Sequence, residues 1–213
     1  VFTVFQNLGF SVGVAKESAQ NPEPGRLGFV SLLIVGVRML ILIPLLGILV
    51  FVVAPQSTSL YEIPDLELMI RISALSIFLR SPGDILGYTL TGSGRFQSYF
   101  ILKLFHETLI TLVVCFFIWQ FNVMGYFVGH SIAAAINTLA SVFVVWRAIE
   151  GRIDWLPFSE IKKLLRSIFK TSTSAFVARL CREFATQLPI LLGGVYMTNE
   201  AVGLLKYGMQ AAS

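Results

Sequence analysis

The sequence predicts an all-α protein that crosses a membrane several times, and three observations support this prediction. First, the 213 residues are 55% hydrophobic and only 13% charged, whereas soluble domains carry roughly 25% charged residues. Second, long apolar runs recur, and the run 29–54 contains one charged residue, Arg38. About 20 apolar residues in a helix cross the ~30 Å hydrocarbon core of a bilayer. Third, Lys and Arg occur only in alternate connections between the runs.

The apolar runs define six complete or partial spans in chain order. The first, 1–14, is the end of a helix before Lys16, and the second, 29–53, stops before Pro55. Polar or glycine-containing turns separate the others, which are 66–90, 97–119, 123–146 and 171–197, and residues from 201 onward begin a seventh. Because the chain starts at Val1 inside one run and ends inside another, we expect a piece of a longer protein.

The charges in the connections predict which side of the membrane each connection occupies. The connections 15–28, 91–96 and 147–170 contain nine Lys and Arg residues, whereas 55–65, 120–122 and 198–200 contain none. Cytoplasmic loops are enriched in Lys and Arg. We therefore expect 15–28, 91–96 and 147–170 in the cytoplasm.

The longest connection has a helical pattern of its own. Ser159 is a suitable N-cap and Glu160 suits the first turn. The apolar residues then fall on one face, with Lys and Arg on the rest: Ile161, Leu164, Leu165, Ile168 and Phe169. We interpret 149–170 as a cytoplasmic amphipathic connector on the inner leaflet, with a solvated helix as the alternative. It divides 1–148, part of an N-terminal bundle, from 171–213, the start of a C-terminal bundle.

Charged residues inside the spans are the candidates for function, because charge in a membrane is costly and usually faces a cavity or the bundle interior. Three pairs are spaced four apart on one helix and can neutralise each other: Arg80–Asp84, Lys103–Glu107 and Arg179–Glu183. Arg38, Arg71 and Arg182 have no acid on their own span at that spacing. Arg38 and Arg182 lie roughly 13–17 Å deep. We therefore predict a cationic cavity, although acids on other helices are the alternative partners.

The remaining features point to packing rather than to catalysis. Small or polar residues recur every four positions in one span: Gly125, Gly129, Ala133, Asn137 and Ser141. Such a stripe lets helices approach closely, with Asn137 as a substrate contact being the alternative. His106 adjoins Glu107, which suits either a proton relay or a structural hydrogen bond. The sequence has no phosphate-binding glycine loop, no metal-ligand cluster and no Ser/His/Asp spacing. We therefore expect that the protein is not an enzyme and that it binds no cofactor, no metal and no nucleic acid.

Three segments, in this order, resemble the polysaccharide flippases (the Wzx-like group) of the multidrug/oligosaccharidyl-lipid/polysaccharide (MOP) exporter superfamily. Segment 5–16 is similar to that family's "DLGLS" segment, with Asn7 in place of the usual acid. Segment 90–96, Leu-Thr-Gly-Ser-Gly-Arg-Phe, resembles its cytoplasmic turn between helices four and five. Segment 172–203, which includes Arg182 and Glu183, resembles helix seven, but Ala185 and Thr186 stand where an Asp is usual.

The resemblance implies an all-α MOP-type fold of two helical bundles, covered here from the end of helix 2 to the start of helix 8. It implies a multi-pass protein of the bacterial plasma (inner) membrane. This protein would transport undecaprenyl-pyrophosphate-linked oligosaccharide by alternating access, for lipopolysaccharide O-antigen, capsule or exopolysaccharide. Membrane lipids, a polysaccharide polymerase and the chain-length machinery are the implied partners. The alternatives are a multidrug efflux pump of the same superfamily and a membrane glycan polymerase or glycosyltransferase.

The intramembrane charges are the site candidates. We expect the cavity to be lined first by Arg38 and Arg182 and secondarily by Arg179, Arg80 and Lys103. Ion or proton coupling is expected to involve Glu107, His106, Asp84 or Glu183.

Overall fold

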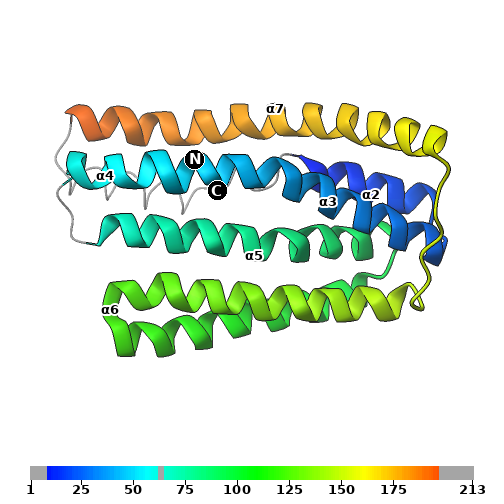
Figure 1. Ribbon diagram of the computed structural model, residues 1–213, viewed down its shortest axis with the longest axis horizontal. Coiled ribbons are helices and arrows are strands. Elements are labelled where there is room, and N and C mark those ends of the chain that lie inside the picture. The colour runs from blue at the N-terminus through cyan, green and yellow to red at the C-terminus, as the bar shows by residue number, and fades with distance from the viewer. Residues whose placement is uncertain (1–8, 62–64, 197–213) are drawn as a thin grey trace.

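The computed structural model describes residues 9–61 and 65–196, and every element in these ranges is a helix. The elements are α2 (Phe10–Gln20), α3 (Pro24–Ile48), the π-helical turn η1 (Leu49–Val53), α4 (Ala54–Tyr61), α5 (Leu66–Gly92), α6 (Phe96–Ala148) and α7 (Phe158–Tyr196). They lie side by side as an elongated bundle with roughly parallel axes (Figure 1). The prediction of an all-α protein is therefore confirmed for the described residues.

α3, η1 and α4 follow one another without a loop, so this span is longer than the predicted 29–53. Pro24 occupies the first turn, where its fixed φ suits a helix start. Pro44 lies inside α3 and lacks the N–H that a helical carbonyl one turn earlier would accept. The π-helical turn begins at Leu49, one turn after this proline. The predicted end at residue 53 is wrong because η1 accommodates an extra residue per turn and lets the helix continue.

α6 consists of two helical halves that correspond to the predicted spans 97–119 and 123–146. Asn122 has φ 52° and ψ −135°, which no helix accommodates, and the chain reverses direction there. After the reversal, a Cβ on Gly125 would overlap the Phe117 carbonyl group, and one on Gly129 would lie 3.0 Å from Val114 Cα. Gly125 and Gly129 therefore let the second half of α6 lie directly against the first. The predicted turn at 120–122 is confirmed.

α7 begins at Phe158, next to the predicted N-cap, and runs without interruption to Tyr196. Its apolar face contacts α2: the rings of Phe10 and Phe169 are 5.4 Å apart, and Ile168 is buried in one cluster with Val14. A Cβ on Gly13 would lie 2.9 Å from Ile168 Cγ2. The prediction that this face lies on the lipid leaflet is wrong, because α2 supplies the apolar partner. The boundaries 1–148, 149–170 and 171–213 stay predictions.

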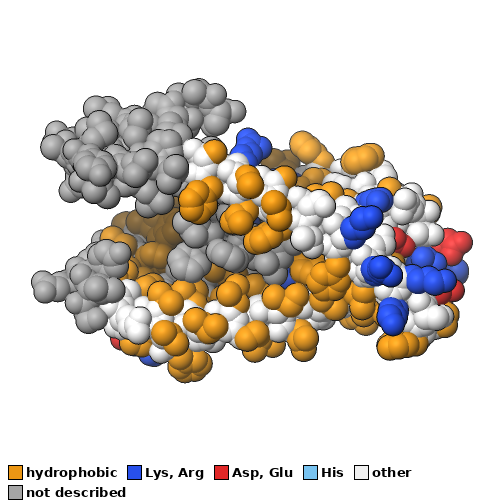
Figure 2. Space-filling view, turned by 90° about the horizontal axis from the view of Figure 1, so that it is seen from above, with side chains coloured by type: hydrophobic (Ala, Val, Ile, Leu, Met, Phe, Trp, Pro, Cys, Tyr) orange, Lys and Arg blue, Asp and Glu red, His pale blue; other side chains and the backbone are white. Residues whose placement is uncertain are grey.

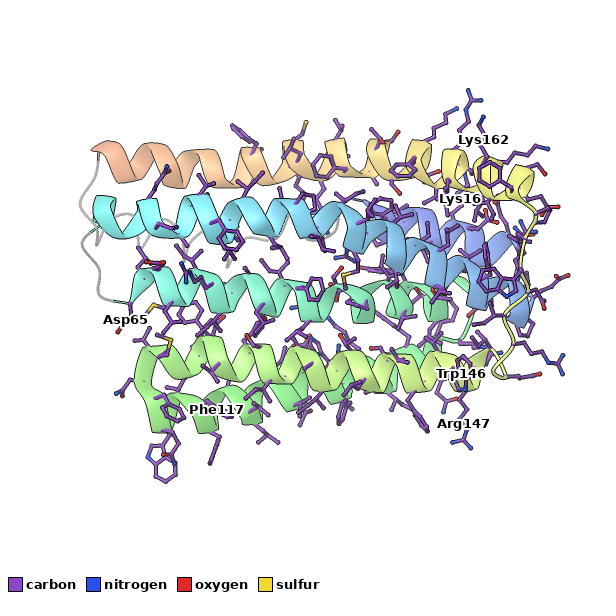
Figure 3. All side chains as sticks on the ribbon, viewed as in Figure 1. Lys16, Asp65, Phe117, Trp146, Arg147 and Lys162 are labelled. Atoms are coloured by element: carbon purple, nitrogen blue, oxygen red, sulfur yellow. The ribbon has the colours of Figure 1, made fainter. Side chains whose placement is uncertain are left out.

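The connections with Lys and Arg meet at one end of the bundle. A Cβ on Gly92 would meet Ala15, and one on Gly25 would meet the Asp154 carboxylate, so 15–28, 91–96 and the start of 147–170 are adjacent. Figure 3 shows Lys16, Arg147 and Lys162 at this end and Asp65 and Phe117 at the other. The predicted separation of the connections with Lys and Arg from those without them is therefore present in the described residues. The connection 198–200 lies outside these residues.

The long sides of the bundle are apolar. Figure 2 shows hydrophobic side chains along its length and most of the visible charged ones at one end. Leu40, Phe51 and Leu139 are each more than two-thirds exposed. Two helices in the described ranges are long and apolar enough to cross a membrane, Pro24–Ser57 with mean hydropathy 2.7 and Phe96–Ala148 with 2.0. The surface fits a lipid environment better than water, in which an apolar patch of this extent is rare.

Candidate functional site

Two hydroxyl groups form hydrogen bonds between the second half of α6 and α5. Ser131 Oγ donates to the Ile72 carbonyl oxygen at 3.2 Å, and Thr138 Oγ1 donates to the Leu79 carbonyl oxygen at 2.6 Å. The donors are seven residues apart and so are the acceptors, which means that both bonds lie on one pair of facing stripes. The small-residue stripe is buried throughout, as predicted. The close approach places Asn137 and Ser141 opposite the middle of α5.

A polar pocket of about 240 Å³ opens at this level. It lies between α5, both halves of α6 and α7. Its lining comprises Arg80, Gly83, Asp84, Gly87 and Tyr88 of α5, Tyr99, Leu102, Lys103, His106, Asn137 and Ser141 of α6, and Arg179 of α7. We refer to it as the cationic pocket, because three basic side chains line it against one carboxylate.

The structure confirms two of the three predicted i,i+4 pairs at this pocket. Arg80 Nε donates to Asp84 Oδ1 at 3.3 Å, and Lys103 Nζ lies 3.0 Å from Glu107 Oε1. Glu107 is 59% exposed and outside the lining of the pocket, so it only partly neutralises Lys103. The third pair, Arg179–Glu183, stays a prediction, because the side chain of Glu183 is outside those that the structure describes.

Arg38 lies behind the pocket rather than in its wall. Its side chain is 1% exposed, with Nη2 3.8 Å from Asp84 Oδ2, and Nη1 donates to the Ser81 carbonyl oxygen at 3.2 Å. An acid on another helix therefore faces Arg38, which is the alternative that the sequence left open. Asp84 is shared between Arg38 on one side and Arg80 on the other. This arrangement holds the carboxylate at the floor of the pocket.

Two other arginines are placed elsewhere. Arg71 forms an ion pair with Glu67 on its own helix. The statement that Arg71 has no acid on its own span at pairing distance is wrong, because Glu67 precedes it by four residues, which places both side chains on one face of α5. Arg182 is exposed on α7 and is not among the residues that line the cationic pocket. Its predicted role as a cavity residue stays a prediction.

Neutral polar side chains complete the pocket. His106 and Asn137 are 5% and 6% exposed, and His106 Nδ1 and Asn137 Oδ1 have no hydrogen-bond partner among the described residues. The sequence placed His106 beside Glu107 as a relay candidate and interpreted Asn137 mainly as packing. In the sequence, the one indication for Asn137 was that an amide occurs in a stripe of otherwise small residues. The packing of the facing helices then shows that Asn137 lines a pocket.

A second pocket of about 300 Å³ lies nearer the other end and is mainly apolar. Leu49, Ile70, Ile77 and Phe127 line it, together with Tyr126 and His130, whose rings stack at 6.0 Å. It gathers no acid or base besides His130. Among the described residues no three His, Cys, Asp or Glu side chains come close enough to hold a metal ion. The cationic pocket is therefore the better candidate site.

Comparison of the sequence with models of known protein families shows to which family the chain belongs. A family model described as polysaccharide biosynthesis protein matches residues 1–213. The chain belongs to this polysaccharide biosynthesis family. Neither a curated protein nor a solved structure matches the chain. Family membership and the two long apolar helices together fit a membrane protein with a role in polysaccharide biosynthesis.

Proposed function

We propose that the chain is part of a flippase that moves undecaprenyl-pyrophosphate-linked oligosaccharide across the bacterial plasma membrane. The observation that carries the proposal is the cationic pocket, in which Arg80, Lys103 and Arg179 face one carboxylate inside an apolar bundle. Membership of a polysaccharide biosynthesis family supports the substrate class. The two-bundle MOP architecture, the multi-pass topology and the partner proteins are parts of the same proposal.

The pocket chemistry suits a phosphate-bearing group. Arginine presents a planar fork of donors that matches phosphate oxygens, and lysine adds a compact charge. Away from bulk water the attraction between such groups and an anion is stronger than at a surface. A volume of about 240 Å³ lies just below the ~300–1,000 Å³ of typical ligand sites. The pocket therefore accommodates the charged headgroup and its nearest sugar, whereas the rest of the glycan lies outside it.

The ion pairs suit a site that opens and closes. Asp84 contacts Arg80 at 3.3 Å and Arg38 at 3.8 Å. An anion that binds Arg80 competes with Asp84, and Arg38 remains to balance the carboxylate. The exchange couples the charge of the substrate to the packing of α3 on α5, which is one element of an alternating-access cycle. A drug pump for cations would need more acids than bases here, and the pocket has the opposite balance.

The experiment is performed with the full-length gene in its native cell. Deletion is expected to leave the lipid-linked glycan on the cytoplasmic face, as detected by a probe that does not cross the bilayer. When the deletion strain is complemented with Arg80→Gln, the amount of glycan on the outer face is expected to be lower than with wild type by about 10-fold or more. The substitution removes a charge-assisted contact with the substrate. Arg71→Gln is the matched control, since Arg71 is on the same helix, paired with Glu67 and outside the pocket.

Rescue by Arg71→Gln is expected to stay within about twofold of wild type, since surface ion pairs contribute little. Full rescue by Arg80→Gln at a normal protein level would show that the pocket does not bind the substrate. Normal outward display of the glycan in the deletion strain, with changed drug sensitivity, would support the efflux alternative. Flipped but unpolymerised glycan would support the enzyme alternative.

A further inference from the structure

The cationic pocket contains a neutral patch that no ion pair explains. We define the amide patch as Asn137 and His106, which face the pocket from the two halves of α6. Both side chains are more than nine-tenths buried, and Asn137 Oδ1 and His106 Nδ1 lack hydrogen-bond partners among the described residues. Buried polar groups in proteins are nearly always satisfied. Among the side chains that line this pocket, these two therefore retain an unused hydrogen-bonding atom that a ligand or its water can satisfy.

The patch and the basic residues sit on the same pocket but differ in chemistry. Arg80, Lys103 and Arg179 are suited to an anion. Asn137 Oδ1 is an acceptor, so it matches a hydroxyl or an amide N–H rather than a phosphate oxygen. Both kinds of group line a volume of about 240 Å³, which holds one small headgroup at a time. The ligand that satisfies the whole pocket therefore has an anionic part and a neutral donor part attached to it.

A glycosyl diphosphate has this composition. We propose that the amide patch binds the sugar that is attached directly to the diphosphate, so that Asn137 and His106 select for a hydroxyl or acylamino substituent on that first sugar. This inference rests on the proposed function and adds to it a specificity-determining pair. The basic residues set affinity for any diphosphate, whereas the amide patch discriminates between headgroups.

The test measures binding to the purified full-length protein in detergent. The two probes are a short-chain isoprenyl diphosphate and the same molecule with one N-acetylhexosamine attached. Asn137→Ala is expected to weaken binding of the glycosylated probe about 10-fold, because it removes one buried hydrogen bond. Binding of the sugar-free probe is expected to stay within about twofold. Alanine already occupies the equivalent stripe position 133, so the substitution keeps the helix contact.

Two further variants separate the patch from packing. His106→Gln keeps a polar group and serves as the second test, with the same selective loss expected. Ser131→Ala is the control, because Ser131 is equally buried on the same face of α6, bonds to Ile72 and lies outside the pocket. It is expected to change the ratio of the two affinities by less than about twofold.

The outcomes distinguish this inference from the proposed function. An equal loss on both probes, or no loss, for Asn137→Ala and His106→Gln overturns the amide patch while wild-type diphosphate binding still supports the cationic pocket. Failure of the wild-type protein to bind either probe overturns the proposed function, and the inference with it. A selective loss in both variants, absent in Ser131→Ala, supports the inference.

Discussion

At the scale of single residues, the ion pairs of the pocket depend on which helix each partner comes from. Arg80 and Asp84 are one turn apart on α5, so their pairing follows from helix geometry alone. Arg38 reaches the same carboxylate from α3, and its side chain is 1% exposed. Because a buried charge is costly without a partner, the Arg38–Asp84 contact stabilises the packing of α3 on α5.

We predict that Arg38 and Asp84 are energetically coupled. Asp84→Leu is expected to destabilise the protein by about 3 kcal/mol, because it removes the carboxylate that faces a buried guanidinium. Arg38→Met is expected to cost less, since Arg80 still contacts Asp84. The double variant is expected to lose less than the sum of the two single variants. Thermal unfolding of the four proteins in one detergent measures this, and strictly additive losses would contradict it.

At the scale of elements, the small-residue stripe determines how closely α5 and the two halves of α6 pack. Gly83 of α5 faces Thr138 and Ser141, and a Cβ there would lie 2.9 Å from Thr138 Oγ1. Gly129 faces the first half of α6 in the same way. The stripe could be recognised in the sequence because a four-residue period maps to one helix face. The helices that pack against the stripe could not be predicted, because the spacing of residues on one helix does not indicate which other helix that face contacts.

We predict opposite effects for two glycine-to-alanine changes. Gly129→Ala is expected to destabilise by about 1–3 kcal/mol, because its Cβ would lie 3.0 Å from the Val114 backbone. Gly36→Ala on α3 is expected to be neutral or to stabilise by about 0.5–1 kcal/mol, since a Cβ there would meet nothing within 4 Å beyond the adjacent helix backbone and alanine is the better helix former. Unfolding midpoints in detergent compare the two. Equal unfolding midpoints for Gly129→Ala and Gly36→Ala would mean that the small-residue stripe does not pack closely against its neighbouring helices.

At the scale of the whole molecule, the described connections with Lys and Arg lie together at one end, and Asp65 and the turn after Phe117 lie at the other. Contacts across the bundle reinforce this arrangement. Arg26 contacts Glu17 of α2 at 3.3 Å and Glu160 of α7 at 3.7 Å. The Asp154 amide donates to the Gly25 carbonyl oxygen at 2.9 Å. The segment between α6 and α7 is therefore held against the start of α3.

We predict that this end faces the cytoplasm. Lys162→Cys and Gln120→Cys are each introduced in full-length protein lacking Cys115 and Cys181, because both native cysteines are exposed. Both residues are exposed, Lys162 at the end with the basic connections and Gln120 two residues before the reversal at Asn122. A maleimide that does not cross membranes is expected to label Gln120→Cys in intact cells and Lys162→Cys only after the membrane is opened. The reverse pattern would invert the topology.

The helical class, the turn at 120–122, the shared end of the basic connections and the pairs Arg80–Asp84 and Lys103–Glu107 could all be predicted from the sequence. These follow from hydropathy, from span length and from the 3.6-residue period, all of which are local properties. Three contacts became visible only once the helices were packed: Arg38 faces Asp84, α7 packs on α2, and His106 and Asn137 line one pocket. Such contacts depend on the rotation and register of one helix against another, and the periodicity of a single helix carries neither.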